Sequence, residues 1–174
     1  MLKQVQALKL NPDAWLSFAV AMSVVLLSVF IGETVPLMIL DLRAQMGLSV
    51  EQANLIRYLP ATAGLLIAPS AGYITDVWGA RRVLSATLAI VCCGSVIIAV
   101  SSSILPLIAG LLVTGMGGLA SMITGYTLLT RTASNSKQLS LFVAAWGIAA
   151  NIGFLIFPLL GSWVLVHSER GWTS

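Results

Sequence analysis

Charge is what this sequence has least of: charged residues make up 9% of its 174 residues, whereas a soluble domain carries about 25%. Hydrophobic residues make up 58%, and the mean hydropathy is +0.97. A chain of this composition cannot cover its surface with groups that water solvates, unless lipid takes the place of water. The composition therefore excludes an ordinary soluble domain and predicts a membrane protein.

Cysteine is also rare, and the residues that build catalytic centres are scattered. The two cysteines, Cys92 and Cys93, are adjacent within an apolar run, which excludes a disulfide framework. The sequence contains no nucleotide-binding loop, no metal-ligand cluster and no nucleophile beside a base. We therefore expect no enzymatic activity, no cofactor and no metal site. The net charge of +3 comes mostly from short loops, which is typical of membrane topology rather than of nucleic-acid binding.

What the sequence does have is a set of five long apolar segments. They run from about 14–40, 53–75, 83–100, 105–129 and 139–166. A helix needs about 20 apolar residues to cross the hydrocarbon core of a bilayer, and the segments lack the alternating pattern of a membrane β-barrel. The predicted fold class is an all-α membrane protein, with a single transmembrane domain over residues 1–174 and five transmembrane helices.

The basic residues near the ends of these segments predict the orientation of the helices. Six of them would lie on one side of the membrane, and three on the other, where acidic residues offset them. The six are Lys3, Lys9, Arg81, Arg82, Arg131 and Lys137, and the three are Arg43, Arg57 and Arg170. Because basic loops stay in the cytoplasm, this pattern predicts a cytoplasmic N-terminus.

Small residues recur at every fourth position in three of the segments. Such stripes let helix backbones approach closely, and they predict that the helices form a bundle. The stripes are Gly64, Ala68 and Gly72; Gly110, Thr114 and Gly118; Gly117, Ser121 and Gly125; and Ala145, Ala149, Gly153 and Gly161, the last interrupted by Phe157.

The most informative stretch is GYITDVWGARRVL, between the second and third predicted helices. A tight turn with cytoplasmic positive charges accounts for Arg81 and Arg82 alone. Gly72 would allow a close helix approach, and Asp76 would cap the next helix and pair with a nearby arginine. Gly79 would supply the positive φ that a tight reversal needs.

This stretch resembles the signature loop of the major facilitator superfamily. That loop reads glycine, three residues, aspartate, a basic residue, any residue, glycine, any residue and two basic residues. The matching positions are Gly72, Asp76, Gly79, Arg81 and Arg82, and Val77 stands where a basic residue is usual. The resemblance implies a fold of twelve helices in two six-helix halves, of which this chain would supply the first five. It also implies that the loop forms part of a cytoplasmic gate, partly through Asp76.

Two further motifs of the family are matched in part. The segment GFLIFPLLGS resembles the helix-five motif of proton-coupled antiporters at Gly153, Pro158 and Gly161. The departures are Phe157 and Ser162, at glycine positions, and, in the fourth segment, Leu111, at the usual arginine position before Gly115. The last residues, GWTS, resemble the start of a sixth helix.

Glu33 is the only acid well inside the first apolar segment. An ionised carboxylate is costly in lipid, so such a residue usually faces the bundle interior or a water-filled cavity. There it would act in proton coupling or cation binding; the alternative is an acid near the outer interface that bonds a neighbouring helix. Arg57 is expected to snorkel, and Asn151 and Tyr126 to line a substrate path or to act in packing.

We expect a secondary transporter that moves a small molecule by alternating access, with proton-coupled efflux as the type that the motifs favour. Its partners would be membrane lipid, the substrate, protons, and the rest of the transporter or a partner chain. Five helices cannot close a central cavity, so we expect a fragment, in a plasma membrane such as the bacterial inner membrane. The alternatives are a truncated membrane protein without transport activity, an assembly partner, or an unrelated channel or scaffold. The sequence does not identify the substrate.

Overall fold

The computed structural model describes residues 12–169, and all of its secondary structure is helical within that range. The helices are α2 (Pro12–Met46), α3 (Val50–Trp78), α4 (Ala80–Ala99), α5 (Ile104–Thr132) and α6 (Ser136–Glu169). Each begins one to three residues before the apolar segment that predicts it. The predictions that concern Lys3, Lys9, Arg170 and GWTS lie outside the described residues.

Four of these helices are long and apolar enough to cross a membrane. The qualifying stretches are Trp15–Glu33, Ala80–Ala99, Ile104–Thr132 and Ser136–Trp163. Even the shortest helix, α4 with 20 residues, reaches about 30 Å at 1.5 Å per residue. The fifth helix, α3, has 29 residues, but Pro60 and Pro69 lie inside it, and it does not reach the same hydropathy. The chain is therefore an integral, multi-pass membrane protein.

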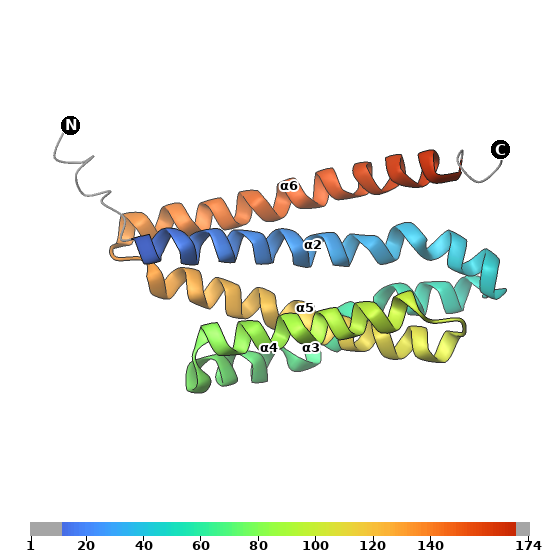
Figure 1. The fold of residues 1–174 in the computed structure, drawn as a ribbon, viewed down its shortest axis with the longest axis horizontal. Helices are drawn as coiled ribbons and strands as arrows, with labels where there is room; N and C mark the ends of the chain where they lie inside the picture. Colours follow the sequence, from blue (N-terminus) through green and yellow to red (C-terminus); the bar gives the residue numbers. More distant parts are fainter. Residues whose placement is uncertain (1–11, 170–174) are drawn as a thin grey trace.

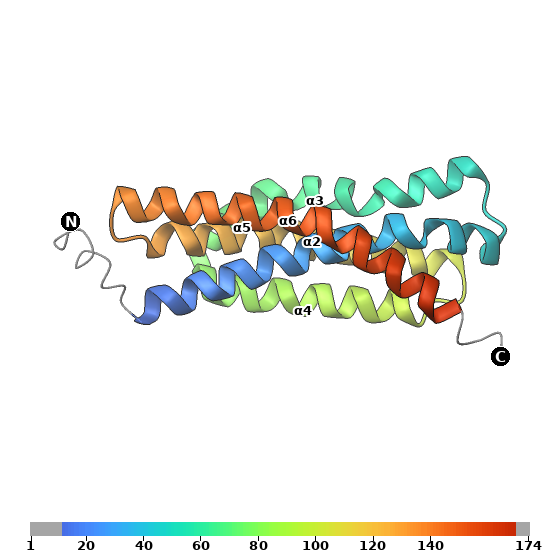
Figure 2. The same ribbon diagram turned by 90° about the horizontal axis from the view of Figure 1, so that it is seen from above.

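The helices run alternately up and down, so their connections gather at two ends of the bundle (Figure 1). The start of α2, the α3–α4 turn and the α5–α6 turn share one end, which we call the signature-loop end. The α2–α3 and α4–α5 connections lie at the opposite end, together with the end of α6. Seen along the perpendicular direction, α4 stays beside α5 and α6 crosses over α2 (Figure 2).

Helix α5 is the centre of the packing, because it contacts α3 and α4 closely and also contacts α2. Its fully buried side chains include Leu107, Leu111 and Leu129. Helix α6 packs mainly against α2, where Val25 of α2 and Phe142 of α6 belong to one buried apolar cluster. The bundle thus has two parts that meet at α2 and α5.

Glycine lets α5 approach its neighbours at backbone distance. A Cβ added to Gly115 would overlap the backbone of Pro60 on α3, and one added to Gly64 would lie 2.9 Å from the Gly115 carbonyl oxygen. Gly117 faces α4 in the same way, with the Thr87 carbonyl oxygen 3.0 Å from the added atom. These contacts confirm that small residues bring the helices together.

The predicted close approach at Gly72 is wrong for the described part of the chain. Nothing lies within 4 Å of a Cβ added to Gly72, because α3 turns Ala71 and Thr75 toward the interior instead. Gly118 on α5 also faces open space. A stripe of small residues therefore does not reveal which of its members lie at a helix contact.

Candidate functional site

The α3–α4 reversal depends on one glycine. Helix α3 ends at Trp78 and α4 begins at Ala80, so Gly79 alone connects them, with φ 86° and ψ 138°. Its N–H donates to the Thr75 carbonyl oxygen at 3.1 Å. A side chain is strained at such a φ, and the predicted positive φ at Gly79 is confirmed.

The brevity of this turn changes the position of two motif residues. Arg81 and Arg82, which we expected in a loop, lie in the first turn of α4, because the reversal is complete at Gly79. Both side chains are exposed. Within residues 12–169 neither of them forms an ion pair.

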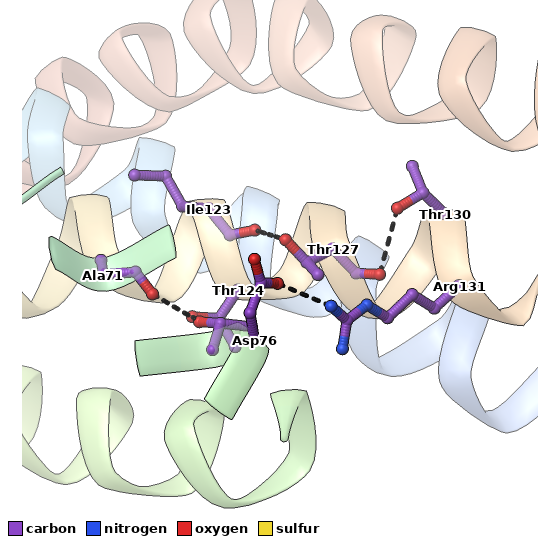
Figure 3. Close-up of polar contacts among 8 residues, drawn as sticks. Ala71, Asp76, Ile123, Thr124, Thr127, Thr130 and Arg131 are labelled. Carbon is purple, nitrogen blue, oxygen red and sulfur yellow. Dashed lines mark hydrogen bonds and ion pairs between the residues drawn. The ribbon is translucent and has the colours of Figure 1, made fainter. Parts of the chain in front are cut away.

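Asp76 binds an arginine from another helix (Figure 3). Nη2 of Arg131, on α5, donates to Oδ1 of Asp76 at 2.6 Å. The predicted arginine partner therefore exists, but it lies 55 positions away in the sequence. The predicted helix cap is wrong, since the N-cap of α4 is Gly79 and no side chain bonds there.

This ion pair is open to solvent, with the Arg131 side chain 51% exposed and that of Asp76 64% exposed. An exposed pair contributes only about 0.2–1 kcal/mol, because water screens the charges and ordering two side chains costs entropy. The contact links the end of α3 to the end of α5, and breaking it costs little free energy.

A buried hydroxyl pair lies close to this ion pair, since Thr75 directly precedes Asp76 on α3 and Thr124 precedes Arg131 on α5. The Oγ1 atoms of Thr75 and Thr124 are 2.9 Å apart, and neither side chain is accessible to solvent. Each hydroxyl also lies within bonding distance of a carbonyl oxygen of its own helix, at Ala71 and Ala120. Since buried polar groups are costly without partners, this pair holds α3 against α5 beneath the exposed ion pair.

A cavity of about 380 Å³ lies among α2, α3, α5 and α6. It is located near the middle of these helices, since its lining includes Val29 on α2, Ala61 on α3 and Gly118 on α5. Its walls are mostly apolar, and Arg57 is the one charged residue in the lining. Gly32 and Gly118 belong to that lining, and nothing lies within 4 Å of a Cβ added to either. The two glycines therefore keep the cavity open.

Glu33 lies beside this cavity and not in its lining. It follows Gly32 on α2, and its side chain is half-buried. No described residue forms a hydrogen bond or an ion pair with it. Within the described residues, Glu33 therefore does not bond a neighbouring helix, which was the alternative interpretation.

The helix-five motif, which lies on α6 in the structure, faces α2. A Cβ added to Gly153 would lie 3.1 Å from Val29, and one added to Gly161 would overlap Leu37, while Pro158 is half-buried between them. Phe157, at a glycine position of the motif, packs edge-on against Phe30 with ring centroids 5.2 Å apart. These residues form a surface on which α6 rests against α2.

The remaining candidates have plainer surroundings. Asn151 is exposed and donates to the Gly147 carbonyl oxygen of its own helix at 2.7 Å. Tyr126 packs against Trp146, with ring centroids 5.9 Å apart. Neither residue lines the cavity, and the described residues contain no group of His, Cys, Asp and Glu that could hold a metal ion.

Comparisons with known proteins agree with the signature loop. A family model described as Major Facilitator Superfamily matches residues 16–174. The chain is 32% identical over 106 residues to a multidrug resistance protein B homolog in each of two strains of Mycobacterium tuberculosis, CDC 1551 / Oshkosh and ATCC 25618 / H37Rv. That match covers 61% of this chain and 19% of each relative, so the chain spans only a small part of their length. No solved structure matches it.

The family model covers nearly all of the chain, including the α3–α4 turn and the four apolar helices. The chain belongs to the Major Facilitator Superfamily of membrane transporters.

Proposed function

We propose that these helices act within a secondary transporter that exports a small molecule by alternating access, in exchange for protons. The observation that carries this proposal is the exposed ion pair of Asp76 and Arg131, which joins α3 to α5 at the signature-loop end. Alternating access requires contacts that form in one state and break in the other at little cost. A pair worth about 1 kcal/mol or less meets that requirement. The relatives' name, multidrug resistance protein B homolog, supports export.

We also propose that α3 crosses the membrane, as the fifth span. Its two ends lie at opposite ends of the bundle (Figure 1). Tyr58 near its start and Tyr73 and Trp78 near its end are all exposed, and such aromatic side chains collect at the two interfaces of a bilayer. With Arg81, Arg82, Arg131 and Lys137 all near the signature-loop end, that end is the cytoplasmic one and the N-terminus is cytoplasmic in a plasma membrane.

Cysteine labelling tests this topology. In a Cys92→Ala/Cys93→Ala background, we expect Glu51→Cys to react with a membrane-impermeant maleimide from outside intact cells. Val77→Cys, at the other end of α3, should react only after the membrane is permeabilised. Labelling of both positions from the same side would show that α3 does not cross.

A charge exchange tests the ion pair in the full-length protein. Asp76→Asn and Arg131→Gln are each expected to lower the transport rate, by up to about fivefold if the pair contributes about 1 kcal/mol to the closed state. The double variant should be no slower than the slower single variant, and the exchange Asp76→Arg/Arg131→Asp should recover part of the rate. Lys137→Gln is the charge-matched control, since Lys137 is exposed and forms no ion pair within the described range. Additive losses in the double variant would contradict a shared role.

A further inference from the structure

The cavity combines apolar walls with a single positive charge. Of its lining residues only Arg57 is charged, and arginine stays protonated in proteins. The Arg57 side chain is exposed, so an anion that enters the cavity can reach it. The composition of the cavity therefore favours a ligand with an apolar body and a negative group.

Arg57 has no such partner within the described residues. Its guanidinium carbon lies 5.9 Å from the ring centroid of Tyr58, a contact that orients the group without neutralising it. The ion pair of Asp76 and Arg131 is the only one that the described range contains. Glu33, the acid beside the cavity, does not pair with Arg57. The five N–H donors of Arg57 are therefore available to an anion.

The hydroxyl groups of the lining are directed elsewhere. Oγ of Ser28 lies 3.4 Å from Oγ of Ser121. Oγ1 of Thr114 is buried without a hydrogen-bond partner, and it lies against Gly94 of α4, where an added Cβ would overlap it. Polar recognition in this cavity thus falls mainly to Arg57.

We infer that the cavity binds amphipathic anions: an apolar ring or chain would occupy the space that Gly32 and Gly118 leave open, and a carboxylate, sulfonate or phosphate would pair with Arg57. This inference rests on the proposed transport function and names its substrate class. The guanidinium fork fits a two-oxygen anion with two parallel hydrogen bonds. A neutral analogue of the same shape would lack that pairing.

Equilibrium binding tests the inference without requiring transport. The full-length protein in phosphatidylcholine nanodiscs is titrated with radiolabelled 2-naphthoate and with the neutral 2-naphthamide. We expect the wild type to bind the anion about tenfold or more tightly than the amide, since a charge-assisted pair is the stronger contact. Arg57→Gln should remove the preference, Arg57→Lys should retain part of it, and Lys137→Gln should leave it unchanged.

Equal binding of the anion and the amide by the wild type overturns the inference, and so does a preference that survives Arg57→Gln. Absence of saturable naphthoate binding overturns it as well. Gly118→Val, which fills the cavity, should weaken both probes while the elution of the folded protein stays that of the wild type. Unchanged binding by that variant would place the anion elsewhere and contradict the assignment.

A second lipid composition separates two sources of the anion, a free molecule and a lipid. In discs that contain phosphatidylglycerol, unchanged naphthoate affinity indicates a free amphipathic anion as the occupant. An affinity that falls in the wild type but not in Arg57→Gln indicates an anionic lipid at the same arginine. Binding without any flux would refute the proposed transport and leave the anion site standing, whereas flux of neutral compounds alone would refute the anion site and leave the transport standing.

Discussion

Gly115→Ala is expected to prevent stable assembly of the bundle. The new methyl group would overlap the backbone of Pro60, and a backbone cannot move aside as the end of a side chain can. Overpacking typically costs about 1–3 kcal/mol and more where the neighbour cannot move, and about 3 kcal/mol is roughly a hundredfold in the ratio of folded to unfolded protein. The measurement is the thermal midpoint in detergent, followed by size-exclusion chromatography.

Gly147→Ala is the matched control for this change. Nothing lies within 4 Å of a Cβ added at Gly147 on α6. Both substitutions raise helix propensity by about 1 kcal/mol in the same way, so the difference between the two midpoints isolates the contact of α5 with α3. Equal midpoints for the two variants would show that the close approach at Pro60 does not hold the bundle together.

Glu33→Gln is expected to abolish proton-driven transport in the full-length protein. The substitution keeps the shape of the side chain and removes the group that would bind and release a proton beside the cavity. Flux driven by an imposed pH gradient in proteoliposomes should fall to the level of liposomes without protein. Exchange of substrate down its own gradient should persist, because the cavity itself is unchanged.

Glu51→Gln is the control for Glu33, since Glu51 is an exposed acid in the first turn of α3 and lies outside the cavity lining. It should retain the proton-driven flux of the wild type. If Glu33→Gln also retains that flux, with an unchanged dependence on pH, another group carries the proton.

The helices themselves were predictable, because each of the five apolar segments coincides with one helix of the structure. The residues at which the helices begin and end were less predictable. Helix α3 begins three residues before its apolar segment, at a capping box in which Ser49 and Gln52 bond each other's backbone N–H groups. The spacing of serine and glutamine three residues apart is a recognised start signal, and it could have located this helix end.

The chemistry of the α3–α4 turn was predictable only in its local part. The φ of Gly79 follows from the short reversal, but the partner of Asp76 does not, because Arg131 meets it only after α5 has folded beside α3. The role of Gly72 was misjudged for the same reason: spacing along α3 does not specify which face meets α5. Contacts between distant segments depend on packing that no local pattern encodes.

Two residues gained importance only from the structure. Arg57, expected to snorkel, is the charged member of the cavity lining. Leu111, at the usual arginine position of the helix-four motif, is 1% exposed and packs with Leu48, Ile56 and Leu107. An arginine there would need a buried partner, which these apolar neighbours do not provide. The departure of this chain from the motif therefore accompanies an apolar core at that position.

The most direct test of the account is flux through the full-length protein in sealed proteoliposomes. A pH gradient is imposed without ATP, and three radiolabelled compounds of similar size are compared: 2-naphthoate, 2-naphthamide and 2-naphthylmethylammonium. We predict that at least one compound accumulates against its own gradient, and that a protonophore collapses this accumulation. If all three cross no faster than in liposomes without protein, under either direction of the pH gradient, proton-coupled alternating access by this protein is contradicted.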